Sequence, residues 1–205
     1  MKTEFLEIQK HLLNDEEPSK YIKQQVNDGG FDDSPLSMIK NLIKVEQNPK
    51  FHPEGNVFIH TMMTIDEGAK IREKSTNKIV FMWTLILHDI GKGPTTKLRN
   101  GKLTSYNHDI VGAEMAREFL NYYRVDESVT NKICALIRYH MQILFTVKQS
   151  RYERLDEMIR AVDTDEIILV SQCDRLGRGN MNISNKNSVE TEIEKFKKII
   201  NDKKY

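Results

Sequence analysis

The sequence has few cysteines. Among its 205 residues only Cys134 and Cys173 are cysteines, and they stand far apart without a CxxC spacing. A small secreted domain held by disulfides needs several cysteines, and a zinc ribbon needs closely paired ones. The sequence therefore predicts neither of these, and the expected location is the reducing cytoplasm.

Long apolar runs are also absent. No stretch approaches the roughly 20 apolar residues that a helix needs to cross a bilayer. The first residues, MKTEFLEIQKHLLNDEEPSK, place acids among the apolar side chains, which is not the pattern of a signal peptide. We expect a soluble protein that does not bind a membrane.

The charge has no excess of either sign. Lys and Arg number 31 and Asp and Glu number 30, so the formal net charge is +1 at pH 7. A nucleic-acid duplex or an anionic membrane would call for a strongly basic surface, and any polyanion must here be bound locally. The lysine-rich end KFKKIINDKKY is predicted to be a solvated helix face, with an RNA contact as the alternative.

The alternation of β-branched residues that marks strands is nearly absent, whereas apolar residues recur at helical spacing. A chain of 205 residues fits one domain better than two. We therefore predict one all-α domain, residues 1–205, built from roughly eight helices around a central cleft. The longer helices are expected at about 57–73, 78–89, 107–123, 126–147, 164–176 and 187–204, with an irregular loop at 91–107.

Histidines are few enough to be considered one by one. Of the six, four lie on or beside apolar helical segments: His60, His88, His108 and His140. Each alone is best interpreted as a hydrogen-bonded core residue. Two acids share these surroundings, since Asp89 follows His88 directly and Asp174 follows an apolar run.

Together these six residues favour a metal site. A buried carboxylate is costly unless it is paired, hydrogen-bonded or bound to a cation. Mixed imidazole and carboxylate ligands suit Mn²⁺, Fe²⁺, Co²⁺, Ni²⁺ or Zn²⁺ better than Ca²⁺. The HExxH spacing of zinc proteases is absent, and no cysteine accompanies the histidines, so a catalytic site is expected rather than structural zinc.

An ordered series of motifs adds a resemblance. The segments, in chain order, are NPKFHPEGNVFIHT, LHDIGKG, NHDIVGAEMA, RYHM and CDRLGRG. This series resembles the HD-domain metal-dependent phosphohydrolases, and most of all the HD domain attached to bacterial CCA-adding tRNA nucleotidyltransferases. It covers about residues 35–180, with helices in 1–34 and the helix 187–204 expected to pack as extensions. The glycine-rich opening and paired aspartates of the nucleotidyltransferase head are not found, so we expect no CCA addition.

The resemblance implies a role for each site residue. Its primary metal ligands fall on His60, His88, Asp89 and Asp174. His108 and His140 match histidines that hold a second metal ion or contact the phosphate, so the site has one ion or two. The expected phosphate-binding residues are Lys92, Arg175 and Arg178, and for Arg178 a structural ion pair is the alternative. His52 is expected to order the HPEG turn rather than to bind metal.

These roles imply the hydrolysis of a phosphoester. A divalent cation lowers the pKa of a bound water toward about 7, which supplies a nucleophile at neutral pH. Lys92, with Arg175 or His108, would offset the phosphate charge, and His108 or His140 would protonate the leaving oxygen if it holds no metal. The expected substrates are nucleotide-type: 2′,3′-cyclic nucleotides, nucleoside monophosphates or RNA ends. The alternative is a non-catalytic signalling or scaffolding module that binds a nucleotide, and the oligomeric state is not predicted.

Overall fold

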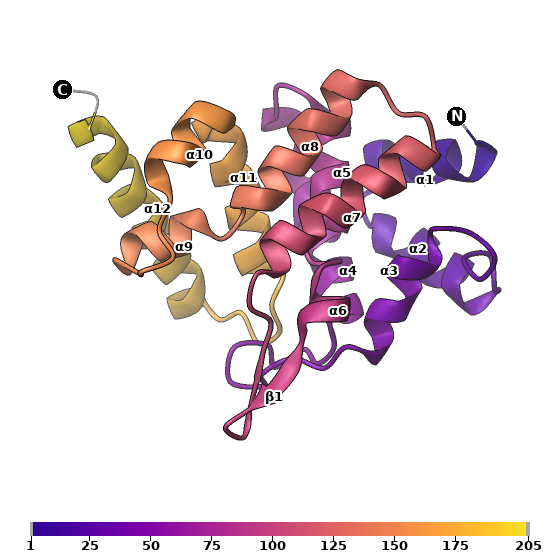
Figure 1. Ribbon diagram of the computed structural model, residues 1–205, viewed down its shortest axis with the longest axis horizontal. Helices are drawn as coiled ribbons and strands as arrows, with labels where there is room; N and C mark the ends of the chain where they lie inside the picture. Colours follow the sequence, from indigo (N-terminus) through magenta and orange to yellow (C-terminus); the bar gives the residue numbers. More distant parts are fainter. Residues whose placement is uncertain (1, 204–205) are drawn as a thin grey trace.

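The computed structural model describes residues 2–203, and helices dominate them (Figure 1). Eight helices in this part of the chain have at least ten residues: α1 Thr3–Asn14, α2 Pro18–Asn27, α4 Val57–Ile71, α5 Lys78–Leu87, α7 His108–Tyr122, α8 Glu127–Tyr139, α11 Thr164–Leu176 and α12 Ile183–Lys203. Shorter helical segments are α3 Ser37–Asn41, η1 Leu42–Lys44, η2 Arg72–Lys74, α6 Lys92–Thr95, α9 Gln142–Val147 and α10 Leu155–Ala161. The predicted all-α fold is confirmed.

The segment 91–107 differs from the predicted irregular loop. It contains α6 and a short antiparallel hairpin of β1 Lys97–Arg99 and β2 Lys102–Thr104. Asn100 and Gly101 form the turn, with φ angles of 49° and 72°. Two positive φ angles in an Asn-Gly pair are the mark of a tight hairpin turn, so the signal was present in the sequence. The prediction of a loop without regular structure was wrong here.

The predicted helix 126–147 is two helices. α8 ends at Tyr139, and α9 begins at Gln142. His140 Nδ1 lies 2.7 Å from the carbonyl oxygen of Ile137. That carbonyl is the one to which the amide of Met141 would donate in a continuous α-helix. The side chain of His140 therefore takes part in ending α8.

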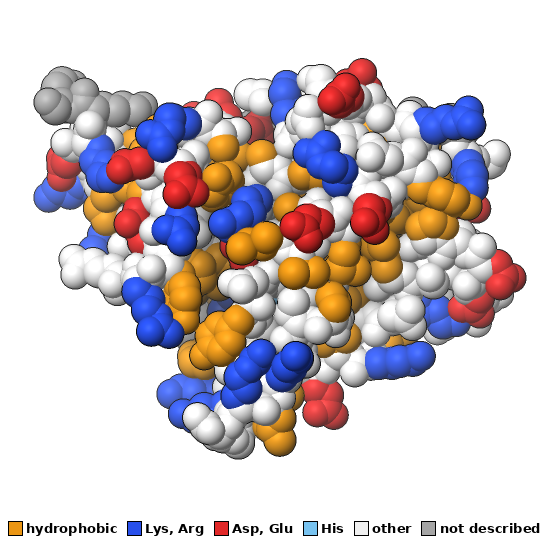
Figure 2. All heavy atoms as spheres, viewed as in Figure 1, with side chains coloured by type: hydrophobic (Ala, Val, Ile, Leu, Met, Phe, Trp, Pro, Cys, Tyr) orange, Lys and Arg blue, Asp and Glu red, His pale blue; other side chains and the backbone are white. Residues whose placement is uncertain are grey.

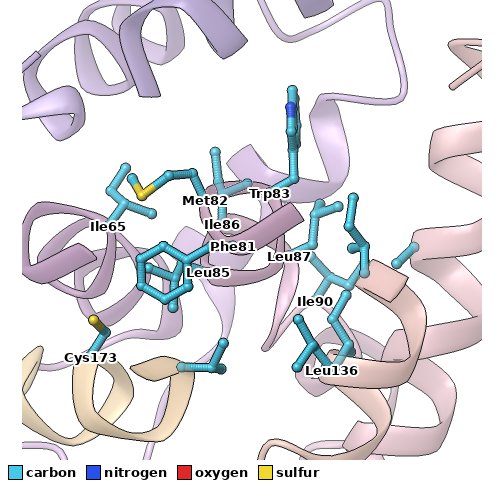
Figure 3. Packing of buried hydrophobic residues seen from close by; sticks show 14 of the residues in the cluster. Ile65, Phe81, Met82, Trp83, Leu85, Ile86, Leu87, Ile90, Leu136 and Cys173 are labelled. Carbon is cyan, nitrogen blue, oxygen red and sulfur yellow. The ribbon is translucent and has the colours of Figure 1, made fainter. Parts of the chain in front are cut away.

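α5 is the central helix of the core. All its residues from Val80 to Leu87 are buried, and it packs against α1, α4, α8 and α11. A helix that is apolar on every face is buried on every face. Figure 3 shows Ile90, just beyond the end of α5, close to Leu136 of α8, and Phe81 on the side of α5 that faces Cys173. This packing fixes the end of α5, where His88 and Asp89 stand.

The terminal helices pack onto this core. Phe5 of α1 stacks on Trp83 with ring centroids 4.0 Å apart, and buried residues of α12 belong to the same hydrophobic cluster. α12 begins at Ile183, earlier than the predicted 187, and the last residue of the predicted helix, Lys204, lies outside the described residues. Within residues 2–203 no helix has the length and apolar character to cross a membrane. That residues 1–205 form a single domain stays a prediction.

Candidate metal centre

Six buried side chains from five helical regions meet at the centre of the molecule. His60 lies within α4, His88 and Asp89 follow the end of α5, and His108 is the first residue of α7. The other two are His140, which follows α8, and Asp174, which lies near the end of α11. The structure thus brings together all six residues that the sequence singled out, and none is more than 8% exposed.

Asp89 divides these side chains into two groups. On one side, its Oδ2 lies 3.6 Å from His60 Nε2 and 3.3 Å from His88 Nε2. Asp174 completes this group, because its Oδ1 lies 3.0 Å from His60 Nε2 and 4.0 Å from His88 Nε2. Ligand atoms of His60, His88 and Asp174 all lie within 4.8 Å of one another, which is the spacing of donors around one ion.

The second group faces the other oxygen of the same carboxylate. Asp89 Oδ1 lies 3.5 Å from His108 Nε2 and 3.9 Å from His140 Nε2. The two Nε2 atoms are 3.2 Å apart. Asp89 therefore presents one oxygen to each group, and the donors of each group could hold a divalent cation.

The ring orientation of the histidines is fixed by backbone carbonyls. Nδ1 lies 2.7 Å from Leu85 O in His88, 2.8 Å from Ser105 O in His108, and 2.7 Å from Ile137 O in His140. His60 Nδ1 lies 3.1 Å from Gly177 O. Since a carbonyl oxygen only accepts, Nδ1 donates the hydrogen in each ring, and Nε2 of each ring lies on the side of Asp89.

Several polar atoms of the centre lack a partner that would justify their burial. Within residues 2–203, His88 Nε2 and Asp89 Oδ1 have no hydrogen-bond partner, and Asp89 Oδ2 has none beside its ion pair with Lys92 Nζ at 2.6 Å. The lone pairs of His108 Nε2 and His140 Nε2 face each other. Unpaired buried groups of this kind are costly, and a shared cation would satisfy all of them. The residues present therefore fit a divalent transition metal.

The electrostatics of the two carboxylates agree with this fit. Burial alone would raise the pKa of Asp89, but the charge of Lys92, together with the neighbouring ring of His88, outweighs it and holds the pKa well below its ordinary value. Burial also acts to raise the pKa of Asp174, and there Arg178, His60 and His88 lower it well below the ordinary value. Both carboxylates are thus ionised at neutral pH, as metal ligands must be.

The histidines differ between the two groups. Burial lowers the pKa of His108 to about 4, opposed by Asp89 and assisted by His140 and Lys92. Burial likewise lowers the pKa of His140. For His60, burial is outweighed by Asp174, Glu54 and Asp89, which raise its pKa. A cation on the Nε2 side of His60 would replace the proton that Asp174 now favours.

Comparison with known proteins assigns the chain to a family. The family described as HD domain matches residues 57–179, which is more than half of the chain. The chain belongs to the HD domain family. Members of this family are generally metal-dependent hydrolases. The HD domain here contains all six residues of the centre.

Two curated relatives carry the name Multifunctional CCA protein. They come from Actinobacillus pleuropneumoniae serotype 5b (strain L20) and serotype 7 (strain AP76). Each is 25% identical over 162 residues, which are 76% of this chain and 38% of the relative. The chain thus spans less than half the length of these relatives, and the similarity agrees with the HD domain of CCA-adding enzymes.

An open cavity of about 310 Å³ lies in front of the centre formed by these six residues. Asp89, His108, His140 and Asp174 line it, whereas His60 and His88 are fully buried and are not among its lining residues. Four cationic side chains also line this cavity: Lys92, Lys148, Arg175 and Arg178. The cavity can therefore receive an anionic group directly in front of the candidate ligands.

The three predicted phosphate-binding residues have different partners. Lys92 Nζ lies 2.6 Å from Asp89 Oδ2 and donates a hydrogen bond of 2.8 Å to Gln47 Oε1. Arg175 forms an ion pair with Glu192 of α12, a partner that the sequence did not suggest. Arg178 Nη2 lies 3.6 Å from Asp174 Oδ1, which is the ion pair considered as its alternative. Lys92 has the most direct access to both the centre and the cavity.

Sequence reasoning missed Glu54, which is the acid of the HPEG turn. Its side chain is 2% exposed, and its Oε1 lies 2.8 Å from His52 Nδ1 and 3.1 Å from His60 Nδ1. The amide of Gly179 donates to its other oxygen at 3.0 Å. Burial acts to raise the pKa of Glu54, but these hydrogen bonds outweigh it and keep the pKa well below the ordinary value.

Glu54 contacts the ring of His60 on the side opposite to Asp89. It is therefore placed to orient His60, a candidate ligand, as carboxylates behind metal-binding histidines commonly do. His52 contacts Glu54 within the turn, in agreement with the ordering role expected for it. The available signal was an acid between a proline and a glycine a few residues before His60.

Proposed function

We propose that this HD domain is a divalent-metal-dependent phosphohydrolase that acts on phosphomonoesters or phosphodiesters of nucleotide type. The candidate substrates are 2′,3′-cyclic nucleotides, nucleoside monophosphates and RNA ends. One observation carries the proposal: Asp89 stands between two groups of imidazoles at the floor of a cavity lined by cationic side chains. Metal ligands and phosphate-binding groups are the two requirements of metal-assisted phosphoester hydrolysis.

The proposed metal ligands are His60, His88, Asp89 and Asp174, with His108 and His140 as ligands of a second ion. This donor set suits Mn²⁺, Fe²⁺, Co²⁺, Ni²⁺ or Zn²⁺. When bound, such a cation supplies Lewis-acid activation of water and neutralises charge on the phosphate. The contact of Glu54 with His60 supports the first group, and the contact of each Nδ1 with a carbonyl supports both.

Other residues of the chain bind and orient the substrate. Lys92 reaches both Asp89 and the cavity, so it can hold a non-bridging phosphate oxygen beside the centre. Arg178 lines the same cavity, and its Nε is buried without a hydrogen-bond partner within residues 2–203. Arg175 is held by Glu192, so its contribution is smaller. These three remain our proposed phosphate-binding residues.

Between the two roles considered for His108 and His140, the contacts favour metal binding over proton donation. The hydrogen on each Nδ1 is directed at a carbonyl oxygen, and the lowered pKa values leave Nε2 without a hydrogen at neutral pH. A neutral ring in this orientation offers a lone pair rather than an acidic proton. Protonation of the leaving oxygen is then left to water.

A hydrolysis panel with metal analysis tests the proposal. The protein, loaded with each of the five metals in turn, is incubated with phosphomonoesters, 2′,3′-cyclic nucleotides and linear phosphodiesters, and released products are measured. We expect turnover by the wild-type protein and none by Asp89→Ala. Full metal occupancy without turnover of any phosphoester would contradict the enzyme and favour the non-catalytic nucleotide-binding module.

A further inference from the structure

A second open cavity, of about 280 Å³, adjoins the cavity of the metal centre. The two cavities share three lining residues, Ser105, His108 and Met141. The second one extends away from His108 between the start of α7 and the segment that follows α9. His108 thus stands at the boundary between two spaces, each open to solvent.

The walls of the second cavity are rich in aromatic rings. Tyr106 and Tyr152 line it with 52% and 40% of their surface exposed, and their ring centroids are 6.4 Å apart. Phe145 of α9 also lines the cavity, with its ring centroid 5.8 Å from that of Tyr152. Large aromatic side chains left exposed beside a site are a common mark of ligand contact.

Cationic side chains accompany these rings. The guanidinium of Arg99 lies 5.0 Å from the ring centroid of Tyr106, and that of Arg151 lies 4.9 Å from the ring centroid of Tyr152. Arg154 lines the cavity, where the charge of Asp109 is already matched by an ion pair with Arg138. Figure 2 shows hydrophobic and basic side chains close together on the face between α9 and the hairpin. This surface suits an aromatic group attached to an anion.

The aromatic wall is held in place by a buried amide. Gln142 is 1% exposed, and its Nε2 donates to Tyr152 O at 3.3 Å. Its Oε1 accepts from the amide of Arg154 at 2.7 Å. The segment carrying Tyr152 and Arg154 is therefore fixed onto α9 before any ligand arrives, which lowers the entropy lost on binding.

We propose that the second cavity is a nucleoside-binding subsite, and that the substrate is a phosphodiester linking two nucleosides. This inference rests on the proposed function. A phosphomonoester has one organic group, whereas a phosphodiester has two, and two cavities that meet at His108 accommodate one group each. The base in the second cavity stacks on Tyr106 and Tyr152, because a base offers a flat face to an aromatic ring whatever its identity.

The reaction follows from this placement. Water adds to phosphorus, the bond between phosphorus and the bridging oxygen of one nucleoside breaks, and that oxygen takes up a proton. The products are one nucleoside and one nucleoside monophosphate. Binding of the second base contributes to substrate affinity, so its loss affects KM more than kcat.

The test compares two substrates and three variants. Steady-state kinetics of the metal-loaded full chain are measured with a diribonucleoside monophosphate and with glycerol phosphate, which has no base. We expect Tyr152→Leu to lower the ratio of the two kcat/KM values by about tenfold, through KM for the dinucleotide. Tyr152→Phe keeps the ring and is expected to keep the ratio. Tyr122→Leu removes an exposed tyrosine that lines neither cavity and serves as the matched control.

A binding measurement separates this inference from the proposed function. Calorimetric titration with a nonhydrolysable dinucleoside methylenephosphonate is expected to give about tenfold weaker binding to Tyr152→Leu than to wild type, with equal metal content. Turnover with an unchanged ratio in Tyr152→Leu, or equal affinity of both proteins for the analogue, would overturn the subsite. Absence of turnover of every phosphoester overturns the proposed function, and the titration still decides whether the subsite binds.

Discussion

Each imidazole of the centre has one nitrogen held by the protein and the other directed at Asp89. In His88, His108 and His140 the holding contact is the carbonyl three residues earlier in the chain. A ring fixed in this way needs little reorganisation to bind a cation, which is the usual advantage of such contacts behind metal ligands. The individual ligands can therefore be tested by substitution.

The two groups around Asp89 predict unequal effects of losing a histidine. His88→Ala and Asp89→Ala are expected to abolish both metal binding and phosphoester hydrolysis. His140→Ala is expected to lower activity while part of the metal is retained, because the group of His60, His88 and Asp174 stays intact. Metal content by mass spectrometry and turnover are measured for each variant, with His11→Ala in α1 as the control. If His140→Ala empties the site as fully as His88→Ala, the distinction between primary and second-ion ligands is wrong.

Glu54 gives a prediction for a residue that does not itself hold the ion. Glu54→Gln removes the negative charge beside His60 Nδ1 but keeps the size of the side chain. We expect metal affinity to fall by about 10- to 100-fold, as is usual for carboxylates behind a ligand. Competition with a chelating dye measures the affinity. Glu46→Gln makes the same change at an exposed acid that lines the cavity in front of the centre, and an equal loss there would show that Glu54 acts only through overall charge.

The segment that follows α5 comes very close to α7. This close approach positions His108, the first residue of α7. Gly91 lies at this crossing, where an added Cβ would stand 2.1 Å from His108 O and 2.5 Å from the amide of Gly112. Both atoms belong to the backbone, so neither can move aside cheaply. Gly91 is thus required by the packing between two elements that each carry candidate ligands.

Substitution of this glycine is expected to cost stability as well as metal. Gly91→Ala forces α7 away and should lower the free energy of unfolding by roughly 1–3 kcal/mol. For a chain of this size each kcal/mol corresponds to a Tm change of roughly 2–4 °C. Gly93→Ala is the matched control, since nothing lies within 4 Å of an added Cβ there. Equal Tm values for the two variants in thermal unfolding would contradict this account of the crossing.

The side chains of the centre come from five helices or the residues directly after them: α4, α5, α7, α8 and α11. A cation held by side chains from all of them binds the folded chain and not the unfolded one, so it stabilises the fold by mass action. At a metal concentration 100 times the dissociation constant, the gain is about 2.7 kcal/mol. We expect chelation to lower Tm by roughly 5–11 °C. Scanning calorimetry with and without chelator measures the shift, and an unchanged Tm would contradict a metal that bridges these helices.

The sequence predicted what depends on local pattern. The all-α class followed from apolar spacing and is confirmed, and the ordered motifs around His60, His88 and Asp174 selected candidate ligands that the fold brings close together. The hairpin at Asn100-Gly101 was missed although its turn residues were visible, because three-residue strands have too little alternation to be recognised. Contacts between segments that lie far apart in the sequence could not be predicted.

Glu54 and Arg175 illustrate that limit. The partner of Glu54 at Gly179 is 125 residues away, and the partner of Arg175 at Glu192 lies on a separate helix. Neither pairing leaves a periodic or composition signal. The second cavity is formed in the same way, from the hairpin end, α7 and the segment after α9, and so it could not be predicted from any one stretch.

The most direct test of the metal centre is the anomalous scattering of a crystal grown with Mn²⁺. The account predicts an anomalous peak on the Oδ2 side of Asp89, among His60, His88 and Asp174, and a second peak on the Oδ1 side if His108 and His140 also hold an ion. A peak at His52 and Glu54 instead, or no peak within reach of Asp89 when the metal is in excess, would contradict it.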